Sequence, residues 1–351
     1  MKATTFTSAL LLVSSVSALP LLFNESEMCD GGHCEKPEMK YETIVDVQPG
    51  YQWDDAGGYC GSWASQRAFL SIGAWISQQQ VRDHTSHCIA PNNGGHDSEI
   101  LSCNIEAAWS NLKIDFEAFD YNASAVPQSA AYNAWLKKHL VQGRVVAWMI
   151  MWSGQSYPIY NFTAPKGMYG HVEPVVGMAS NHPLTDATVY DDDVVLHYTD
   201  GGTETVHRLF SSLPGKWPGG SFKQGDKADC SPYKYCIGNP YGFGWAATGF
   251  THDTKSATAA PALLHVDPYL REPDTRKGAG PEDLIGSLEV SGLTVGTKYD
   301  IYRWDTVTDA FTYTTAFKRS DFTATAAKYT YADDKVFKSD GTTYYRVVPA
   351  E

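Results

Sequence analysis

The sequence has few positive charges and no cluster of them. It contains 27 Lys and Arg against 40 Asp and Glu, which gives a formal net charge of −13. Nucleic-acid binding needs clustered cations that neutralise phosphates, so we expect no nucleic-acid partner. No segment approaches the roughly 20 uninterrupted apolar residues of a membrane span, so we expect no membrane association. A Gly-rich nucleotide loop and a redox motif are also missing, and the sequence implies no cofactor.

The N-terminus has the features of a secretory signal peptide over residues 1–18. Lys2 precedes an apolar stretch, Ala9–Val13, and the small residues Val16–Ala18 form a typical cleavage site. N-glycosylation sequons agree with export, and we predict a secreted, extracellular glycoprotein. The predicted glycosylation sites are Asn24, Asn122 and Asn161.

An odd number of cysteines, seven, follows the predicted signal. In an oxidising compartment most of them are expected to form disulfides. Three pairs are close in sequence: Cys29 with Cys34, Cys88 with Cys103, and Cys230 with Cys236. This local pairing leaves Cys60 over, and an odd thiol in a secreted protein indicates reactivity or intermolecular pairing.

The order of hydrophobic patterns predicts an α+β fold, with helices first and strands afterwards. Apolar residues at helical spacing run from Ala64 to Ile76, so we predict a helix that begins at Cys60. Further helices are predicted over Ser98–Leu112 and Ala130–Leu140, and strands over Arg144–Trp152, His171–Met178 and Asp193–Gly202.

The end of the chain has a strand pattern only, after a linker rich in Pro, Gly and charge. The predicted strands are Leu284–Val290, Lys298–Trp304, Ala310–Thr315, Thr323–Tyr331 and Thr342–Val348, which suggest a small all-β sandwich. The predicted parts are a signal peptide (1–18), an N-terminal segment (19–42), an α+β domain (43–266), a linker (267–282) and the β-sandwich (283–351).

Cys60 has the sequence setting of a nucleophile. The partial positive charge of a helix N-terminus stabilises a thiolate, and an imidazole brought close by the fold completes the activation. His171 begins an apolar strand and is the best candidate for that base, with Asp200 after the following strand to orient it. His197 is a rival base, and Asn239 is another candidate orienter.

A metal site is the alternative for one histidine cluster. His84, His87 and His96 flank Cys88 at spacings that zinc ligands can adopt. The nearby Cys103 offers Cys88 a disulfide partner instead, and we predict no metal.

The segments Gly58–Ala64 and His171–Met178, followed by Asp200, resemble the papain-like cysteine peptidase superfamily. The resemblance is nearest to the bacteriocin-processing, double-glycine peptidase branch and covers about residues 45–210. It implies a two-part domain, with a helical half and an antiparallel sheet half. It also implies Cys60 as nucleophile, His171 as base and Asp200 as orienter, acting on a peptide or protein substrate.

The chain departs from the family pattern near the nucleophile. Papain has two cysteines in this motif, whereas here there is one. The position of the family's oxyanion-stabilising glutamine holds Asp54, and Gln52 lies two residues earlier. An acidic side chain disfavours a developing oxyanion, so we assign the role to Gln52 together with the Cys60 backbone N–H.

These features predict a secreted thiol hydrolase that cleaves a peptide or isopeptide bond through an acyl-enzyme on Cys60. Two alternatives stay open. An acyltransferase or peptide cyclase would use the same first half-reaction, and a non-catalytic secreted binding protein would keep the scaffold alone. The sequence makes no prediction of the oligomeric state.

Overall fold

The computed structural model describes residues 38–53, 58–86, 100, 103–120, 123–124, 129–153, 168–199, 205–212, 235–237, 244–266 and 282–351. Its α-helices are α2 (Cys60–Leu70), α3 (Gln78–Asp83), α4 (Cys103–Asn111) and α5 (Ser129–Val141). In these ranges no helix is long and apolar enough to cross a membrane.

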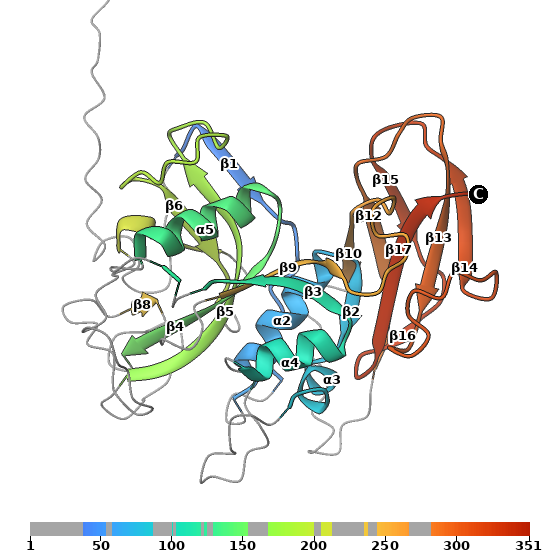
Figure 1. Ribbon diagram of the computed structural model, residues 1–351, viewed down its shortest axis with the longest axis horizontal. Helices are drawn as coiled ribbons and strands as arrows, with labels where there is room; N and C mark the ends of the chain where they lie inside the picture. The colour runs from blue at the N-terminus through green and yellow to red at the C-terminus, as the bar shows by residue number, and fades with distance from the viewer. Residues whose placement is uncertain are drawn as a thin grey trace, which may run out of the picture.

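A large antiparallel sheet forms one side of the molecule, with strand order β3-β9-β4-β5-β6-β7 (Figure 1). Two further strands join it, because β1 pairs with β5 and β8 pairs with β4. Its strands are β1 (Tyr41–Ile44), β3 (Ile114–Ala118), β4 (Val146–Ser153), β5 (Met168–Ser180), β6 (Val194–His197), β7 (Val206–Leu209), β8 (Tyr235–Ile237) and β9 (Gly244–Phe250). The described chain is therefore an α+β fold, as predicted.

The two faces of this sheet are covered by different helices. On β5, Val172 and Val176 belong to the hydrophobic cluster that contains α2, whereas Val175 belongs to the cluster that contains α5. This follows from the pleat, which sends successive side chains to opposite faces. All eleven residues of α2 are buried, so this helix lies in the interior and not on the surface.

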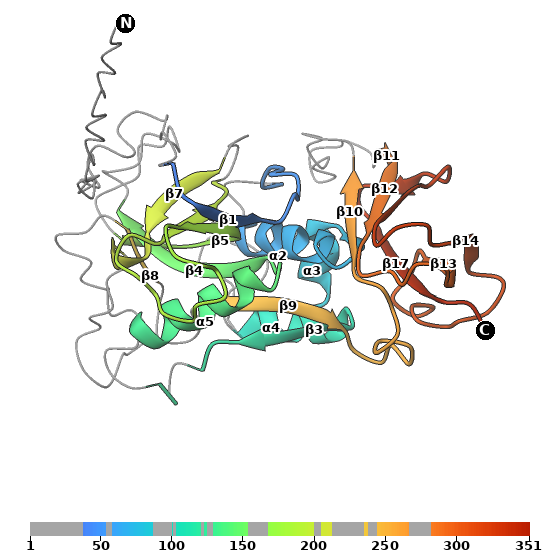
Figure 2. The same cartoon turned by 90° about the horizontal axis from the view of Figure 1, so that it is seen from above.

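The C-terminal part forms smaller antiparallel sheets with the orders β14-β13-β17-β2, β10-β12-β15 and β11-β16. Their strands are β2 (Ala74–Ile76), β10 (Ala262–Val266), β11 (Asp283–Leu284), β12 (Gly286–Val290), β13 (Lys298–Trp304), β14 (Lys318–Thr323), β15 (Tyr329–Ala332), β16 (Phe337–Lys338) and β17 (Thr342–Pro349). Helices α2, α3 and α4 lie between these sheets and the large sheet (Figures 1 and 2).

Strands β2 and β10 precede residue 267 in sequence, yet they pair with strands that follow residue 282. One hydrophobic cluster accordingly runs from Val47 to Val348 and includes residues of both parts. Most of the predicted linker lies outside the described residues, and the division at 267–282 stays a prediction.

The predicted helix from Cys60 through Ile76 is wrong in its second half. The helix ends at Leu70, and Gly73 adopts φ +89, in the left-handed region that favours glycine. Ala74–Ile76 is then strand β2, with Trp75 opposite Thr343 of β17.

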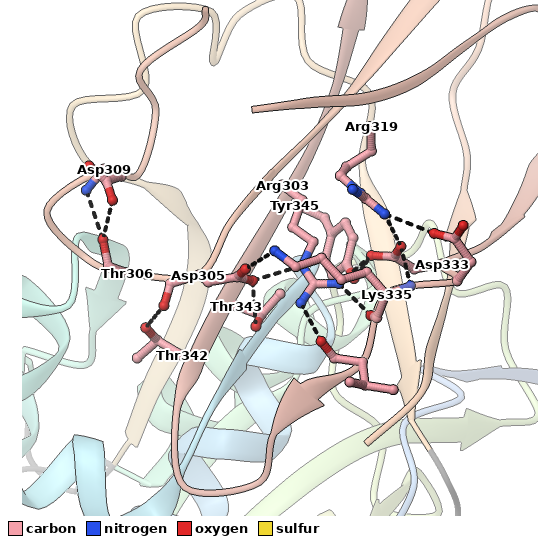
Figure 3. A network of polar contacts seen from close by, with 12 residues as sticks. Arg303, Asp305, Thr306, Asp309, Arg319, Asp333, Lys335, Thr342, Thr343 and Tyr345 are labelled. Atoms are coloured by element: carbon pink, nitrogen blue, oxygen red, sulfur yellow. Dashed lines mark hydrogen bonds and ion pairs between the residues drawn. The ribbon is translucent and has the colours of Figure 1, made fainter. Parts of the chain in front are cut away.

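A buried polar network ties strands β13 and β17 to the segment between β15 and β16 (Figure 3). An Arg303 guanidinium nitrogen lies 2.6 Å from Asp333, and the Tyr345 hydroxyl donates to the same carboxylate. Arg303 also contacts Asp305 at 2.7 Å and donates to the Val336 carbonyl at 3.0 Å. Because each buried charge has partners, the network satisfies the requirement for burying polar groups.

Candidate functional site

Cys60 is the first residue of α2, as the sequence predicts. Among the cysteines that the structure describes, it is a thiol and not half of a disulfide, and it is 7% exposed. The first turn of α2 contains no acidic residue, and the N-cap residue Tyr59 provides no side-chain cap. The partial positive charge of the helix N-terminus is therefore available to stabilise a thiolate.

The backbone around Cys60 is fixed by close packing. Gly58 has φ +66, which lets the chain turn sharply into the helix, and Trp63 N–H donates to the Tyr59 carbonyl at 2.8 Å. A side chain at Gly61 would collide with the carbonyl oxygen of Ile100. The glycine that follows Cys60 is thus needed for this approach of two backbones.

Helix α3 supports the segment before Cys60. The Arg82 guanidinium lies over the Tyr59 ring, 3.8 Å from its centroid, and donates to the Gly58 carbonyl at 3.2 Å. The Tyr59 hydroxyl donates to Gln79, and the Tyr59 ring meets Trp53 edge-on. These contacts fix the turn that leads into α2.

His171 lies on β5 and is 7% exposed. Burial lowers its pKa below the usual value of about 6.5; the nearby Glu173 opposes this shift and His197 adds to it. The imidazole is therefore neutral at pH 7 and able to accept a proton. Its Nε2 lies 3.7 Å from Oε1 of Glu173.

Glu173 is the centre of a buried polar cluster that sequence reasoning missed. It is fully buried, and its Oε2 lies 2.8 Å from Nδ1 of His197. Arg208 Nε donates to Nε2 of His197 at 3.1 Å, so the His197 proton lies on Nδ1 and faces Glu173. Trp148 Nε1 donates to the same carboxylate at 3.4 Å. The signal was present as His-Val-Glu, because residues two apart share one face of a strand.

Cys60 and His171 lie on neighbouring elements, since α2 packs against β5 (Figure 2). Val172 belongs to the cluster of Cys60, whereas His171 alternates with it and lies on the face of Glu173. On that face the imidazole contacts Glu173. The pairing of Cys60 with His171 stays a prediction.

Gln52 is described and buried, at 6% exposed. Asp54, which holds the position of the family's glutamine, lies outside the described residues. The predicted orienter Asp200 and the alternative Asn239 also lie outside them. The rival base His197 is the Glu173 partner already described.

The predicted signal peptide and modification sites also fall outside the described ranges. Each predicted disulfide includes at least one cysteine there, and of Cys103 and Cys236 only the backbone is described. The positions outside the described residues are Cys29, Cys34, Cys88, Cys230, Asn24, Asn122 and Asn161. These predictions stay untested.

The histidine cluster around Cys88 is described only at His84. Its Nδ1 lies 2.8 Å from the Gln80 carbonyl oxygen, and His87 and His96 lie outside the described residues. In the part of the chain that the structure covers, no group of three His, Cys, Asp or Glu side chains has the arrangement of a metal site.

Comparisons with known proteins give one weak structural likeness. No protein-family model and no curated protein matches the chain. Among solved structures, it is similar to a clostridial cysteine protease, Cwp84, after propeptide cleavage, at 10% sequence identity and a TM-score of 0.27. The likeness covers 86% of this chain and 81% of that one.

Proposed function

We propose that this protein is a secreted thiol hydrolase that cleaves a peptide or isopeptide bond through an acyl-enzyme on Cys60. The observation that carries the proposal is the position of Cys60 as the first residue of a buried helix, after a turn that α3 holds in place. A thiol in this setting is the usual nucleophile of papain-like enzymes, and we propose that layout for residues 43–266.

In the proposed reaction the Cys60 thiolate attacks the carbonyl carbon, and a C–S bond forms as the carbonyl oxygen becomes an oxyanion. The Cys60 N–H and the Gln52 side chain stabilise that oxyanion. His171, which took the thiol proton, gives it to the leaving amine as the C–N bond breaks. Water then loses a proton to His171, adds to the acyl carbon, and the C–S bond breaks. An amine in place of water gives a transferase or cyclase.

Two carboxylates are candidates for holding the His171 ring. Asp200 is the sequence-predicted orienter, and Glu173 lies 3.7 Å from Nε2 in the structure. A carboxylate at Nε2 keeps the proton there and leaves Nδ1 to exchange a proton with the thiol.

A second candidate function is a non-catalytic secreted binding protein. The departure of this sequence from the family pattern favours it, because an acidic residue, Asp54, holds the position of the family's oxyanion-stabilising glutamine.

Alkylation of Cys60 by iodoacetamide at pH 5.5 decides between the two functions. An ordinary thiol, with a pKa near 8.5, is only about 0.1% thiolate at that pH. An activated Cys60 should react about 10- to 100-fold faster than glutathione, and Cys60→Ser should abolish the labelling. The substitution His171→Gln should return the rate to that of glutathione.

The outcomes separate cleanly. A wild-type rate no higher than that of glutathione would refute the hydrolase and leave the binding protein. A fast wild-type rate that His171→Gln does not change would assign the base to another residue. Parallel measurements on Glu173→Gln and Asp200→Asn show which carboxylate supports the base.

A further inference from the structure

The oxygen and the nitrogen of the Gln78 side-chain amide both hydrogen-bond to the backbone, one on each side of Gln52. Its Oε1 accepts from the Trp53 N–H at 2.9 Å, and its Nε2 donates to the Tyr51 carbonyl at 2.8 Å. Gln78 is 1% exposed. Water therefore cannot easily replace either bond, and each is worth more than a surface hydrogen bond.

The two bonds hold the two peptide planes that flank the Cα of Gln52. The Tyr51 carbonyl belongs to the plane before it, and the Trp53 N–H belongs to the plane after it. Because a peptide unit is planar, fixing both planes fixes φ and ψ of Gln52 and with them the direction of its Cα–Cβ bond. Gln78 therefore sets where the Gln52 side chain begins.

The start of α3, which carries Gln78, is itself fixed by the C-terminal part of the chain. Ser77 N–H donates to the Gly341 carbonyl at 3.0 Å, and its hydroxyl donates to the Asp340 carbonyl at 2.9 Å. Trp75 Nε1 donates to the Ser339 carbonyl at 3.1 Å. These carbonyls belong to the turn between β16 and β17, beside the pairing of β17 with β2.

We propose that Gln78 is a positioning residue for Gln52, which stabilises the oxyanion. We also propose that the turn 339–341 fixes the start of α3 and therefore the position of Gln78. The inference rests on the proposed function and adds residues that the sequence motif does not contain. It also means that the C-terminal sheets help to position residues of the candidate site. Losing one oxyanion donor typically lowers a rate about 100- to 1,000-fold, and displacing it by about 1 Å costs up to 100-fold. For loss of the two Gln78 hydrogen bonds we expect the rate of the oxyanion-forming step to fall about 10- to 100-fold.

Two reactions of the same thiol separate positioning from general damage. Alkylation by iodoacetamide needs the thiolate but forms no oxyanion. Acylation by p-nitrophenyl acetate needs the thiolate and passes through an oxyanion, and it releases p-nitrophenolate that absorbs visible light. The ratio of the acylation rate to the alkylation rate therefore reports the oxyanion site alone. Cys60→Ser gives the background of both reactions.

The chain offers a matched control, because three glutamines are consecutive at the start of α3. Gln78→Met removes both hydrogen bonds to the backbone around Gln52 with little change in side-chain volume. Gln80→Met makes the same chemical change on the same helix. We expect Gln78→Met to lower the ratio about 10- to 100-fold while the alkylation rate stays within about 2-fold of wild type. Gln80→Met should change neither rate.

Other outcomes would overturn the inference. It is wrong if Gln78→Met leaves the ratio unchanged, or if it lowers both rates in parallel. If Gln78→Met does not fold, Trp75→Phe removes the indole N–H that donates to Ser339, and an unchanged ratio in that variant refutes the inference. A wild-type thiol that is neither alkylated nor acylated rapidly refutes the proposed function, which is a separate result.

Discussion

The buried carboxylate of Asp333 should be one of the most sensitive positions for stability. It is 1% exposed, lies 2.6 Å from Arg303 and 3.2 Å from Arg319, and accepts from the Tyr345 hydroxyl (Figure 3). The substitution Asp333→Asn keeps the shape but removes the charge, which leaves the buried Arg303 with Asp305 as its remaining carboxylate partner. Removing one partner of a buried ion pair typically costs about 3–5 kcal/mol.

Urea unfolding measures this cost, and the neighbouring residue provides the control. Asp334 is paired with Arg319 at 2.8 Å, yet its side chain is 90% exposed. An exposed pair contributes about 0–1 kcal/mol, so Asp334→Asn should lower the free energy of unfolding by no more than that. If the two variants differ by less than about 1 kcal/mol, the argument from burial is refuted. Tryptophan fluorescence and far-UV circular dichroism should shift together, because one hydrophobic cluster spans both parts of the chain.

The same residue sets a pH dependence. Burial pushes the pKa of Asp333 upward, but hydrogen bonds from Tyr345 and Arg303 outweigh it and hold the pKa below its usual range. The folded pKa thus lies below the unfolded value of about 3.9. Its stabilisation is present above that value and is lost as the pH falls through the folded pKa. Asp333→Asn should flatten the acid limb of the stability curve below about pH 4.

Two further predictions concern buried groups on α5. Burial lowers the pKa of His139 to about 4, with Arg144 adding to the shift and Glu117 opposing it. The unfolded chain takes up this proton first, so about 3 kcal/mol of stability should be lost as the pH falls from about 6.5 to about 4, and His139→Gln should remove that loss in urea titrations at the two pH values. Lys137 lies 2.9 Å from Asp193, with both side chains almost fully buried. Lys137→Met should lower the free energy of unfolding by about 3–5 kcal/mol, and adding Asp193→Asn should restore part of it; a loss below about 1 kcal/mol would contradict the argument.

Sequence periodicity predicted the elements whose hydrophobic pattern fits only one type of structure. The strand Lys298–Trp304 has the predicted bounds, and the helix predicted over Ala130–Leu140 is Ser129–Val141. The pattern failed where distant chain segments decide the structure. Trp75 and Ile76 fit a helical face as well as a short strand, and only the pairing with β17 selects the strand.

The strand predicted over Ala310–Thr315 is also absent, since the structure has turns there. Phe311 has φ 71, which a strand does not allow. Its ring and that of Tyr313 both contact Trp304 edge-on. The alternating aromatics that suggested a strand therefore pack around one tryptophan from a turn.

In the candidate site, too, only the residues with a local sequence signal were predictable. The helix start at Cys60 was predictable, because glycines before a helical pattern are a local signal. Glu173 has no counterpart in the family pattern, which places the orienting carboxylate after the next strand. Gln78 and Arg82 carry no local signal at all, since their role depends on where α3 lies relative to Tyr51–Tyr59.

Strand β2 is the element through which the C-terminal sheets reach the candidate site. It is three residues long, with α2 before it and α3 directly after it in sequence. It also pairs with β17, and the turn 339–341 holds Ser77 as well. A shift of β17 would therefore move the end of α2, which carries Cys60, and the start of α3, which carries Gln78. Since packed elements respond as rigid bodies, the C-terminal sheets should influence the site even though none of their side chains needs to touch a substrate.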